Sequence, residues 1–542
     1  MPSVAAAFAS VLRAAGVRRV YGLPGEDHLR LLDALDDAGL TYVAAREEGA
    51  AVLMAATEAQ ATGLPGVVVV TLAPGITNAI NGLAHAWLDR VPLLVVTGQH
   101  NPERTPIIIR QGLDTHRLVE PVTKWTTTAS PRIHQVLARA LETALAPPAG
   151  PVLFELREDV ASAAAIDSLD AWPLLQLGSH TRTLVAGADT LTLPADVEEQ
   201  LSRAARPAMI VGGNCPADAP TRAALEHLGT TLHAPMFTSP SAMGILAAES
   251  EWFAGAFMNG NLETELLSRS DLLLTVGLDA TDFFNGAWRY SAPLIAVNER
   301  PDTQRFAPTT IQLVGPTRAA LTALACAASG PTSKWSEAEV ASYRSQLATP
   351  FHLDDGGFTI ASALRLARSL LPSETRVAVD AGFGKPLASY LWSASAPGRY
   401  FTAHGLSTMG YALPAANALC LTYPGEPVVA FMGDGSLLMR AAEISVAVEQ
   451  HVAPIYVVWV DGALAQIETK QLRQNLHPVG ARLPDVDCAR IADAFGGRGI
   501  DVECLEDFRH ALTDALAARA PTLIGARVDQ SRRAEWYELL RG

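Results

Sequence analysis

Residues 428–462 read VVAFMGDGSLLMRAAEISVAVEQHVAPIYVVWVDG, and this stretch decides the fold of the C-terminal part of the chain. Its two apolar runs, VVAFMG and APIYVVWV, have the length and composition of buried strands, and the segment between them has a helical pattern. Together they predict one βαβ unit with parallel strands and a right-handed crossover. The strands end at Asp434 and Asp461, so the sheet should bring both carboxylates to the edge where α/β proteins bind ligands.

The same alternation of short apolar runs and helical patterns fills most of the chain. It predicts an α/β fold with three doubly wound parallel-sheet domains, at residues 1–165, 187–330 and 355–535. The segments 161–186 and 329–357 have the composition of connections between these domains.

The composition excludes several classes of function. A net charge of −15 and a pI near 5.3 argue against binding to nucleic acid or to an anionic membrane surface. The five cysteines are scattered and show neither a disulfide framework nor zinc-ligand spacing. No apolar stretch is long enough to span a bilayer. We therefore expect a cytoplasmic protein without a nucleic-acid or membrane partner.

The two strand ends have a chemical interpretation. Two neighbouring carboxylates repel each other unless a cation lies between them, and Mg²⁺ prefers carboxylate and carbonyl oxygens completed by phosphate. Gly435 and Ser436 open the following helix, where free backbone N–H groups favour a phosphate. The pattern thus predicts a Mg²⁺–diphosphate site. The alternative, that Asp434 only caps the helix and Asp461 only forms a turn, stays open on spacing alone.

GDGS, the helix and strand that follow, and a polar-Gly turn 27 residues after Asp434 resemble the GDG…NN signature of thiamine-diphosphate enzymes. That family includes acetolactate synthases, pyruvate and benzoylformate decarboxylases, and benzaldehyde lyase. The resemblance implies thiamine diphosphate and Mg²⁺ as cofactors, with the metal held by Asp434, Asp461 and the Ala463 carbonyl. Val460-Asp461 replaces the family's Asn-Asn pair, which adds a negative charge to the site.

A second match lies at residues 46–63, REEGAAVLMAATEAQATG, which resemble the family's RHEQAAAFMADGYARATG. The family's glutamate there hydrogen-bonds a ring nitrogen of the cofactor's aminopyrimidine. A gapless alignment selects Glu48 rather than Glu47 for this role. The alternative is that both are solvated acids at a helix N-terminus.

Further matches extend the resemblance over the first and third domains, as the pyrimidine-binding and diphosphate-binding domains. HGLSTMGYALPAANA, residues 404–418, places Met409 as the wedge that bends the cofactor and the Ser407 carbonyl as its hydrogen-bond acceptor. VDAGFGKP adds Phe383 and Gly384. The cofactor-binding set implied in this way comprises Glu48, Phe383, Gly384, Ser407, Met409, Gly433, Asp434, Gly435, Ser436, Asp461, Ala463, Gln466 and Ile467.

The substrate side of the site is less defined. Gln111 aligns with a glutamine in the active sites of acetolactate synthases and benzaldehyde lyase, and with Glu48 it forms the expected catalytic pair. Ile467 stands where pyruvate decarboxylases carry a glutamate. The candidates for the substrate pocket are Glu26, His28, Leu72, Gln111, His404 and Gln466. Glu26 could equally be an exposed acid at a helix start.

The resemblance implies a lyase or transferase that decarboxylates a 2-oxo acid or joins two carbonyl compounds into a 2-hydroxy ketone. Alternatives are acetolactate synthase proper and a cofactor-binding homologue with little activity. Because the family's glutamate crosses a subunit interface, at least a homodimer is implied, and we favour a homotetramer. The central Rossmann-like domain has no GxGxxG fingerprint, so we do not expect FAD.

Overall fold

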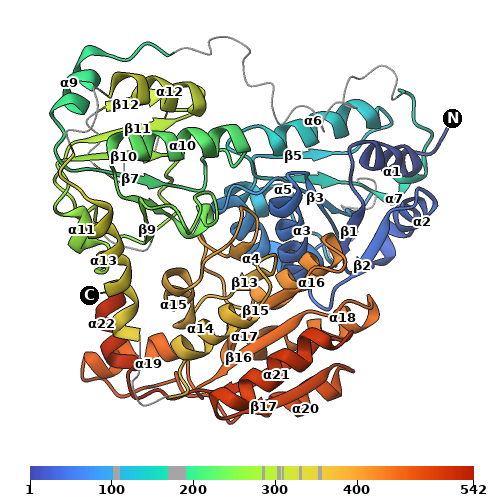
Figure 1. Ribbon diagram of the computed structural model, residues 1–542. Helices are drawn as coiled ribbons and strands as arrows, with labels where there is room; N and C mark the ends of the chain where they lie inside the picture. Colours follow the sequence, from blue (N-terminus) through green and yellow to red (C-terminus); the bar gives the residue numbers. More distant parts are fainter. Residues whose placement is uncertain are drawn as a thin grey trace.

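The structure is a computed structural model that describes residues 1–101, 110–168, 191–283, 287–301, 307, 311–328, 333–351 and 357–541. Three six-stranded sheets form its framework, and the described strand pairs within each are parallel. In Figure 1 the first sheet lies at the upper right, the central one at the upper left and the third below them. The predicted fold class, three doubly wound α/β units, is confirmed.

The first sheet has the strand order β2-β1-β3-β4-β6-β5. Its strands are β1 (Arg19–Gly22), β2 (Thr41–Ala44), β3 (Gly66–Val70), β4 (Leu93–Thr97), β5 (Trp125–Thr128) and β6 (Pro151–Glu155). Its helices are α1 (Val4–Ala14), α2 (Leu29–Asp37), α3 (Glu48–Thr62), α4 (Pro74–Leu88), α5 (Thr115–Val119), α6 (Ile133–Leu145) and α7 (Glu158–Ser162).

The central sheet has the order β12-β11-β10-β7-β8-β9, with strands β7 (Pro207–Val211), β8 (Met236–Thr238), β9 (Phe253–Ala256), β10 (Leu272–Val276), β11 (Leu294–Asn298) and β12 (Ile311–Val314). Its helices are α9 (Ala195–Arg203), α10 (Ala219–Leu232), α11 (Thr264–Leu267), α12 (Thr317–Ala327) and α13 (Glu337–Ala348). Counted from β7, this is the order 3-2-1-4-5-6 of dinucleotide-binding folds.

The third sheet has the order β14-β13-β15-β16-β18-β17. Its strands are β13 (Arg376–Val379), β14 (Tyr400–Thr402), β15 (Val428–Gly433), β16 (Ile455–Val460), β17 (Arg498–Val502) and β18 (Thr522–Arg527). The helices are α14 (Ile360–Leu370), α15 (Gly384–Leu391), α16 (Ala412–Thr422), α17 (Asp434–Arg440), α18 (Ile444–Glu449), α19 (Ala465–Arg473), α20 (Cys488–Ala494), α21 (Leu505–Ala517) and α22 (Arg533–Arg541). Counted from its first strand, the order is 2-1-3-4-6-5, the same as in the first sheet.

The βαβ unit predicted around Asp434 is present, with β15 and β16 paired in parallel from Val429↔Ile455 onwards. Its helical segment differs from the prediction, because it is divided into α17, a 3₁₀ turn and α18. The segment 329–357, predicted as a connection, contains the helix α13 among its described residues. Residues 169–186 of the other predicted connection lie outside the described residues. The domain limits 1–165, 187–330 and 355–535 stay predictions.

The first and third units meet at a buried contact. There α3 of the first unit packs between α4 of the same unit and α16 of the third unit. Burial on all sides explains why α3 is rich in alanine and shows no polar stripe, since both of its faces meet other helices. The approach to α4 is very close: a Cβ built on Gly82 would lie 2.5 Å from the Cβ of Val52. This packing fixes the position of Glu48, the first residue of α3.

No described helix has the length and apolarity needed to cross a membrane.

Candidate active site

A cavity opens at the carboxyl edge of the third sheet, between the ends of β13, β15 and β16. This is the point where the strand order reverses, the place where open α/β sheets bind ligands. All the predicted cofactor residues of the third unit line it: Phe383, Gly384, Ser407, Met409, Gly433, Asp434, Gly435, Ser436, Asp461, Ala463, Gln466 and Ile467. Residues far apart in the sequence are therefore brought together as predicted, although their roles stay predictions.

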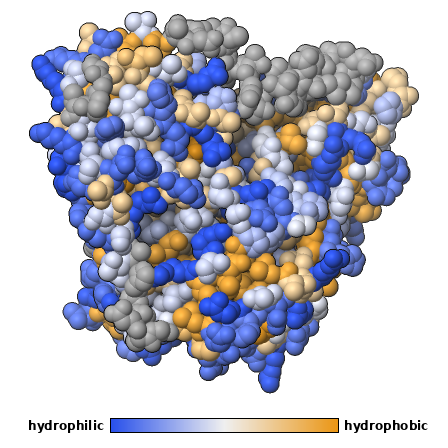
Figure 2. Space-filling model, in the orientation of Figure 1, coloured by the Kyte–Doolittle hydropathy of each residue, from blue (hydrophilic) through white to orange (hydrophobic). Residues whose placement is uncertain are grey.

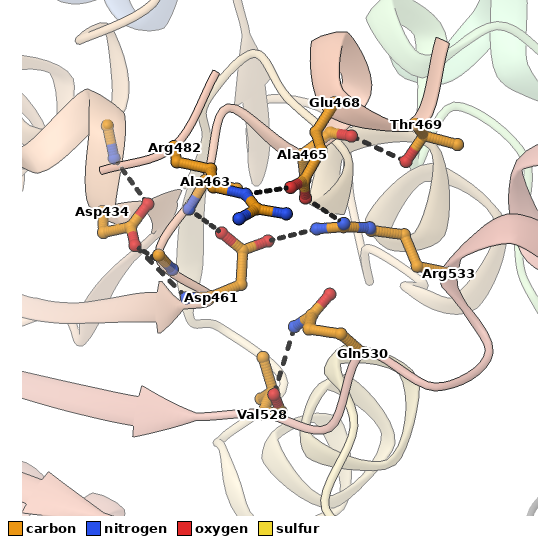
Figure 3. Close-up of polar contacts among 12 residues, drawn as sticks. Asp434, Asp461, Ala463, Ala465, Glu468, Thr469, Arg482, Val528, Gln530 and Arg533 are labelled. Carbon is orange, nitrogen blue, oxygen red and sulfur yellow. Dashed lines mark hydrogen bonds and ion pairs between the residues drawn. The ribbon is translucent and has the colours of Figure 1, made fainter. Parts of the chain in front are cut away.

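Asp434 occupies the base of this cavity and is only 1% exposed. Its carboxylate accepts N–H groups from Gly435 at 2.8 Å, Gly462 at 2.8 Å and Asp461 at 3.2 Å. Burial raises the pKa of Asp434 above its ordinary value, and these hydrogen bonds oppose that rise. The turn that follows β16 therefore holds this side chain through the N–H groups of Asp461 and Gly462 (Figure 3).

Asp461 lies beside Asp434, and its side chain is 7% exposed. Burial, and next the negative charge of Asp434, raise the pKa of Asp461 to about 7. A divalent cation would relieve both costs, because it attracts the charged form of each carboxylate. The donor set therefore fits Mg²⁺: two carboxylates and Ala463, a residue of the cavity wall whose backbone carbonyl is the third expected ligand.

Within the described residues, no group of three or more His, Cys, Asp or Glu side chains could hold a metal ion by itself. A Mg²⁺ ion bound by two carboxylates and a carbonyl would still need further oxygen ligands. A diphosphate in the same cavity could supply them, as is usual for Mg²⁺ sites with few protein ligands.

A charged network continues from Asp461 to the C-terminal helix (Figure 3). Arg533 Nη1 lies 3.9 Å from Asp461 Oδ2, and Nη2 of the same guanidinium pairs with Glu468. Glu468 also binds Arg482, with 3.1 Å between Nε and Oε1. Burial works to raise the pKa of Glu468, but the hydrogen bonds from Arg482 and Arg533 hold it below its ordinary value.

Asp380 is a cavity residue that sequence reasoning missed. It is 2% exposed, and burial raises its pKa to about 6. Its carboxylate accepts the Ser436 hydroxyl at 2.8 Å and the N–H groups of Gly410 at 3.0 Å and Ala412 at 2.9 Å. Asp380 therefore joins the start of α17 to the loop that carries Met409. The available signal was its place directly after β13, the same strand-then-acid pattern as at Asp434 and Asp461.

The loop with Ser407 and Met409 is held from several sides. Ser407 has a left-handed φ of 52°, a strained conformation for a residue with a Cβ. The buried Lys385 donates to the Ala403 carbonyl at 2.5 Å and to Ser407 Oγ at 3.4 Å. From the first unit, the Asp89 carboxylate accepts the backbone N–H of His404 at 3.0 Å. This loop is thus fixed by both units before any ligand binds.

Three cavity residues have more local roles. A Cβ on Gly384 would lie 2.9 Å from Trp459 Nε1, so glycine keeps this wall open. Gln466 Nε2 donates to the Gly382 carbonyl at 2.8 Å, while the Ile467 side chain is exposed.

Glu48 is buried at the start of α3 and does not line the cavity of its own chain. Its Oε2 accepts a 3.0 Å hydrogen bond from Asn78 Nδ2. The neighbouring Glu47 has a different task, because it caps α3 by accepting the Ala50 N–H and pairs with Arg440. The two acids that compete in the sequence are therefore distinct in their surroundings.

The substrate-pocket candidates are divided among four places, one of which is the cavity described above, lined by Gln466. His28 and Leu72 lie together at the edge of the first sheet, where Asp27 accepts the Thr71 hydroxyl at 2.6 Å and the Leu72 N–H at 3.0 Å. His28 Nε2 accepts the Gly25 N–H at 2.9 Å, which is a structural role. The other candidates are Glu26, an exposed residue beside them; Gln111, exposed and left-handed with φ 60°; and His404, in a second cavity with Arg90 and Asp282.

Three family models match the chain, one for each sheet. They are described as the thiamine pyrophosphate enzyme N-terminal TPP binding domain, at residues 2–118, the central domain, at 195–324, and the C-terminal TPP binding domain, at 380–526. The last match begins at Asp380 and includes every metal-ligand candidate.

Relatives match this chain over nearly its whole length and theirs. A probable 2-ketoarginine decarboxylase of Pseudomonas aeruginosa is 29% identical over 94% of this chain and 91% of its own length. A catabolic acetolactate synthase of Raoultella terrigena is 27% identical over 96% and 94%. Among solved structures, a thiamine diphosphate-dependent 4-hydroxybenzoylformate decarboxylase of Rhodococcus jostii shares the fold, with a TM-score of 0.80, 24% identity and coverage of 97% and 99%.

Proposed function

Because the chain belongs to the family of thiamine-pyrophosphate enzymes, we propose that its third unit holds thiamine diphosphate and Mg²⁺ and uses them on a 2-oxo acid or a 2-hydroxy ketone. The observation that carries the proposal is one cavity that gathers Asp434, Asp461, Ala463 and Met409 at the switch point of the sheet. Two of its relatives are named for 2-ketoarginine decarboxylation and acetolactate synthesis.

In this proposal Asp434, Asp461 and the Ala463 carbonyl hold the metal, and the start of α17 faces the diphosphate. Met409 lines the same cavity and would pack against the cofactor; its Cε lies only 3.3 Å from the position that a Cβ on Gly435 would take. Thiamine diphosphate supplies the electron sink for cleavage next to a carbonyl. The protein contributes position, a cavity with apolar walls, and Glu48 as the acid at the pyrimidine.

The acids that line the cavity each have another task in this proposal. Its lining carboxylates among the described residues are Asp380, Asp434 and Asp461. Asp380 is committed to the Ser436 hydroxyl and two backbone N–H groups, and the other two are the metal ligands in this proposal. No other carboxylate among the described residues lines this cavity, so an acid that protonates the reacting carbon would come from outside it.

The test combines binding with product analysis. We expect saturable binding of thiamine diphosphate in Mg²⁺, seen by calorimetry and by quenching of Trp459, which lines the cavity. EDTA should weaken this binding strongly, because the diphosphate needs the cation. The holoenzyme should then release CO₂ from members of a 2-oxo acid panel and form 2-hydroxy ketones. A protein that fails to bind the cofactor in the presence of Mg²⁺ would contradict the proposal.

The active unit in this proposal is a homodimer, because Glu48 lies outside the cavity of its own chain. Figure 2 shows hydrophobic residues gathered over the third unit, in the lower half of that face. The exposed apolar side chains of this unit include Leu438 and Met439 on α17 and Leu472 on α19. Leu438 and Met439 are adjacent in the sequence, and neighbouring exposed apolar side chains are typical of a protein interface, here with a second copy.

Met439→Glu is expected to shift the protein to monomers and to lower its activity at low concentration, because a buried charge at an interface is costly. Val314→Glu, at an exposed apolar residue on the edge strand β12, is the matched control and should leave the mass unchanged. Sedimentation velocity measures both, and it also tests the prediction of a homotetramer. A wild-type monomer with full turnover would refute the dimer.

A further inference from the structure

The candidate metal site contains more negative charge than the family motif requires. Asp461 stands where the motif has asparagine, so two buried carboxylates lie side by side. They are kept together by the backbone, because the Asp461 N–H itself donates to Asp434 Oδ2. Two neighbouring buried carboxylates are unfavourable without a compensating positive charge. A positively charged side chain near the two carboxylates would therefore stabilise their ionised forms, in addition to any bound Mg²⁺.

Arg533 supplies such a charge. Its guanidinium lies between Asp461 Oδ2, at 3.9 Å from Nη1, and Glu468, with which Nη2 pairs (Figure 3). The side chain is only 13% exposed. It begins α22, a helix anchored by the buried Trp536, whose indole N–H donates to the Pro350 carbonyl at 3.1 Å. The position of the guanidinium is thus set by a packed helix and not by a free surface side chain.

We propose that Arg533 is a positioning residue of the metal site, which balances the carboxylate of Asp461 and thereby sets the affinity for the divalent cation. The proposal rests on the function proposed above. When both carboxylates are ionised, Asp434, Asp461 and Arg533 together carry one net negative charge, while the charges of Glu468 and Arg482 cancel each other. One net negative charge is the charge of one carboxylate and one amide. Arg533 on α22 therefore offsets the extra negative charge that Asp461 adds in place of the motif's asparagine.

Two consequences follow from this balance. Without Arg533, the cation would meet a more negative site, so Mg²⁺ should bind more tightly. In the absence of Mg²⁺, the same site would hold two carboxylates with no nearby compensation, so the folded protein should be less stable. A residue that only anchored a helix would produce the second effect without the first.

The alternative is a purely structural role, in which Arg533 only connects α22 to α19 through its ion pair with Glu468. Arg482 provides the matched control, because it binds the other oxygen of Glu468 at 3.1 Å and is 72% exposed. Arg482→Gln removes a partner of Glu468, and Arg533→Gln removes a partner of both Glu468 and Asp461. The difference between the two variants isolates the contact with Asp461.

The experiment measures Mg²⁺ binding by calorimetry at saturating thiamine diphosphate and thermal unfolding in EDTA. We expect Arg533→Gln to tighten Mg²⁺ binding about three- to tenfold, the size of one partly screened charge interaction. Arg482→Gln should change it less than about twofold. In EDTA, Arg533→Gln should lower the unfolding midpoint more than Arg482→Gln does. That excess should disappear when both are introduced with Asp461→Asn.

Three outcomes would overturn the inference, and they differ in what else they affect. Equal Mg²⁺ affinities of the two arginine variants would refute it while the proposed function stands. The same holds if the loss of stability persists in the Asp461→Asn background, because the effect would then come from Glu468. A wild-type protein that binds neither Mg²⁺ nor thiamine diphosphate would overturn both the inference and the proposed function.

Discussion

Replacing Glu48 with glutamine is expected to lower turnover roughly 100- to 10,000-fold, the usual contribution of a positioned acid or base. Glutamine has the same size and can still accept the Asn78 Nδ2 hydrogen bond, so α3 should stay in place. It cannot hold the proton that the pyrimidine ring requires. Cofactor binding should survive, because the residues proposed to hold the metal and the diphosphate lie in the third unit. Steady-state rates and a calorimetric cofactor titration measure the two effects separately.

Glu47→Gln is the matched control for this prediction. Glu47 caps α3 and pairs with Arg440, so its loss should cost about 1 kcal/mol of stability, typical of a helix N-cap, with turnover retained. The pair of variants also decides the alignment register, which the sequence leaves to a gapless match. An inactive Glu47→Gln beside an active Glu48→Gln would place the catalytic role at Glu47 and show that its assignment to Glu48 is wrong.

Asp434→Asn should abolish assembly of the holoenzyme, with thiamine diphosphate affinity in Mg²⁺ reduced at least about 100-fold. This exceeds the 10- to 100-fold loss typical of residues that only support metal ligands. The amide removes the charge that attracts the cation, and its NH₂ group cannot accept the N–H groups that now converge on the carboxylate. Calorimetry with and without Mg²⁺ measures the loss.

The same chemical change at Asp461 should have a much smaller effect. Asparagine there keeps an oxygen ligand and matches the family motif, so Asp461→Asn should bind the cofactor with only a modest loss of Mg²⁺ affinity. A loss at Asp461→Asn as large as that at Asp434→Asn would contradict the prediction that an amide oxygen suffices at residue 461. Wild-type affinity in Asp434→Asn would remove Asp434 from the metal site altogether.

Much of the fold was predictable from the sequence because the central strands are uninterrupted apolar runs. Strands such as β3, GVVVV, and β16, IYVVWV, are buried along their whole length. Five strands had no such signal: β5, β8, β9, β14 and β17. All except β8 lie at the edge of a sheet, and β5, with the sequence WTTT, is partly exposed. An edge strand needs little apolar surface, so hydrophobic patterning does not reveal it.

The candidate site shows a similar division. Asp434, Asp461 and Met409 were predictable because short motifs carry them. The contact of Arg533 with Asp461 was not predictable, because it depends on how α22 packs and no local sequence pattern indicates it. Ser436 was predicted to receive a phosphate, but its hydroxyl proton is already given to Asp380. The Ser436 hydroxyl can therefore accept a further hydrogen bond but not donate one, and a diphosphate would have to be bound by backbone N–H groups of α17.

The first and third sheets share the strand order 2-1-3-4-6-5, and they also share a bridge at the same place. In each, an aspartate after the first strand accepts a hydroxyl that follows the third strand: Thr71 to Asp27, and Ser436 to Asp380. Duplication of one ancestral module, followed by divergence, would leave this pairing behind. In the proposed assignment, the acids for a cation lie in one of these two matching units and Glu48 lies in the other.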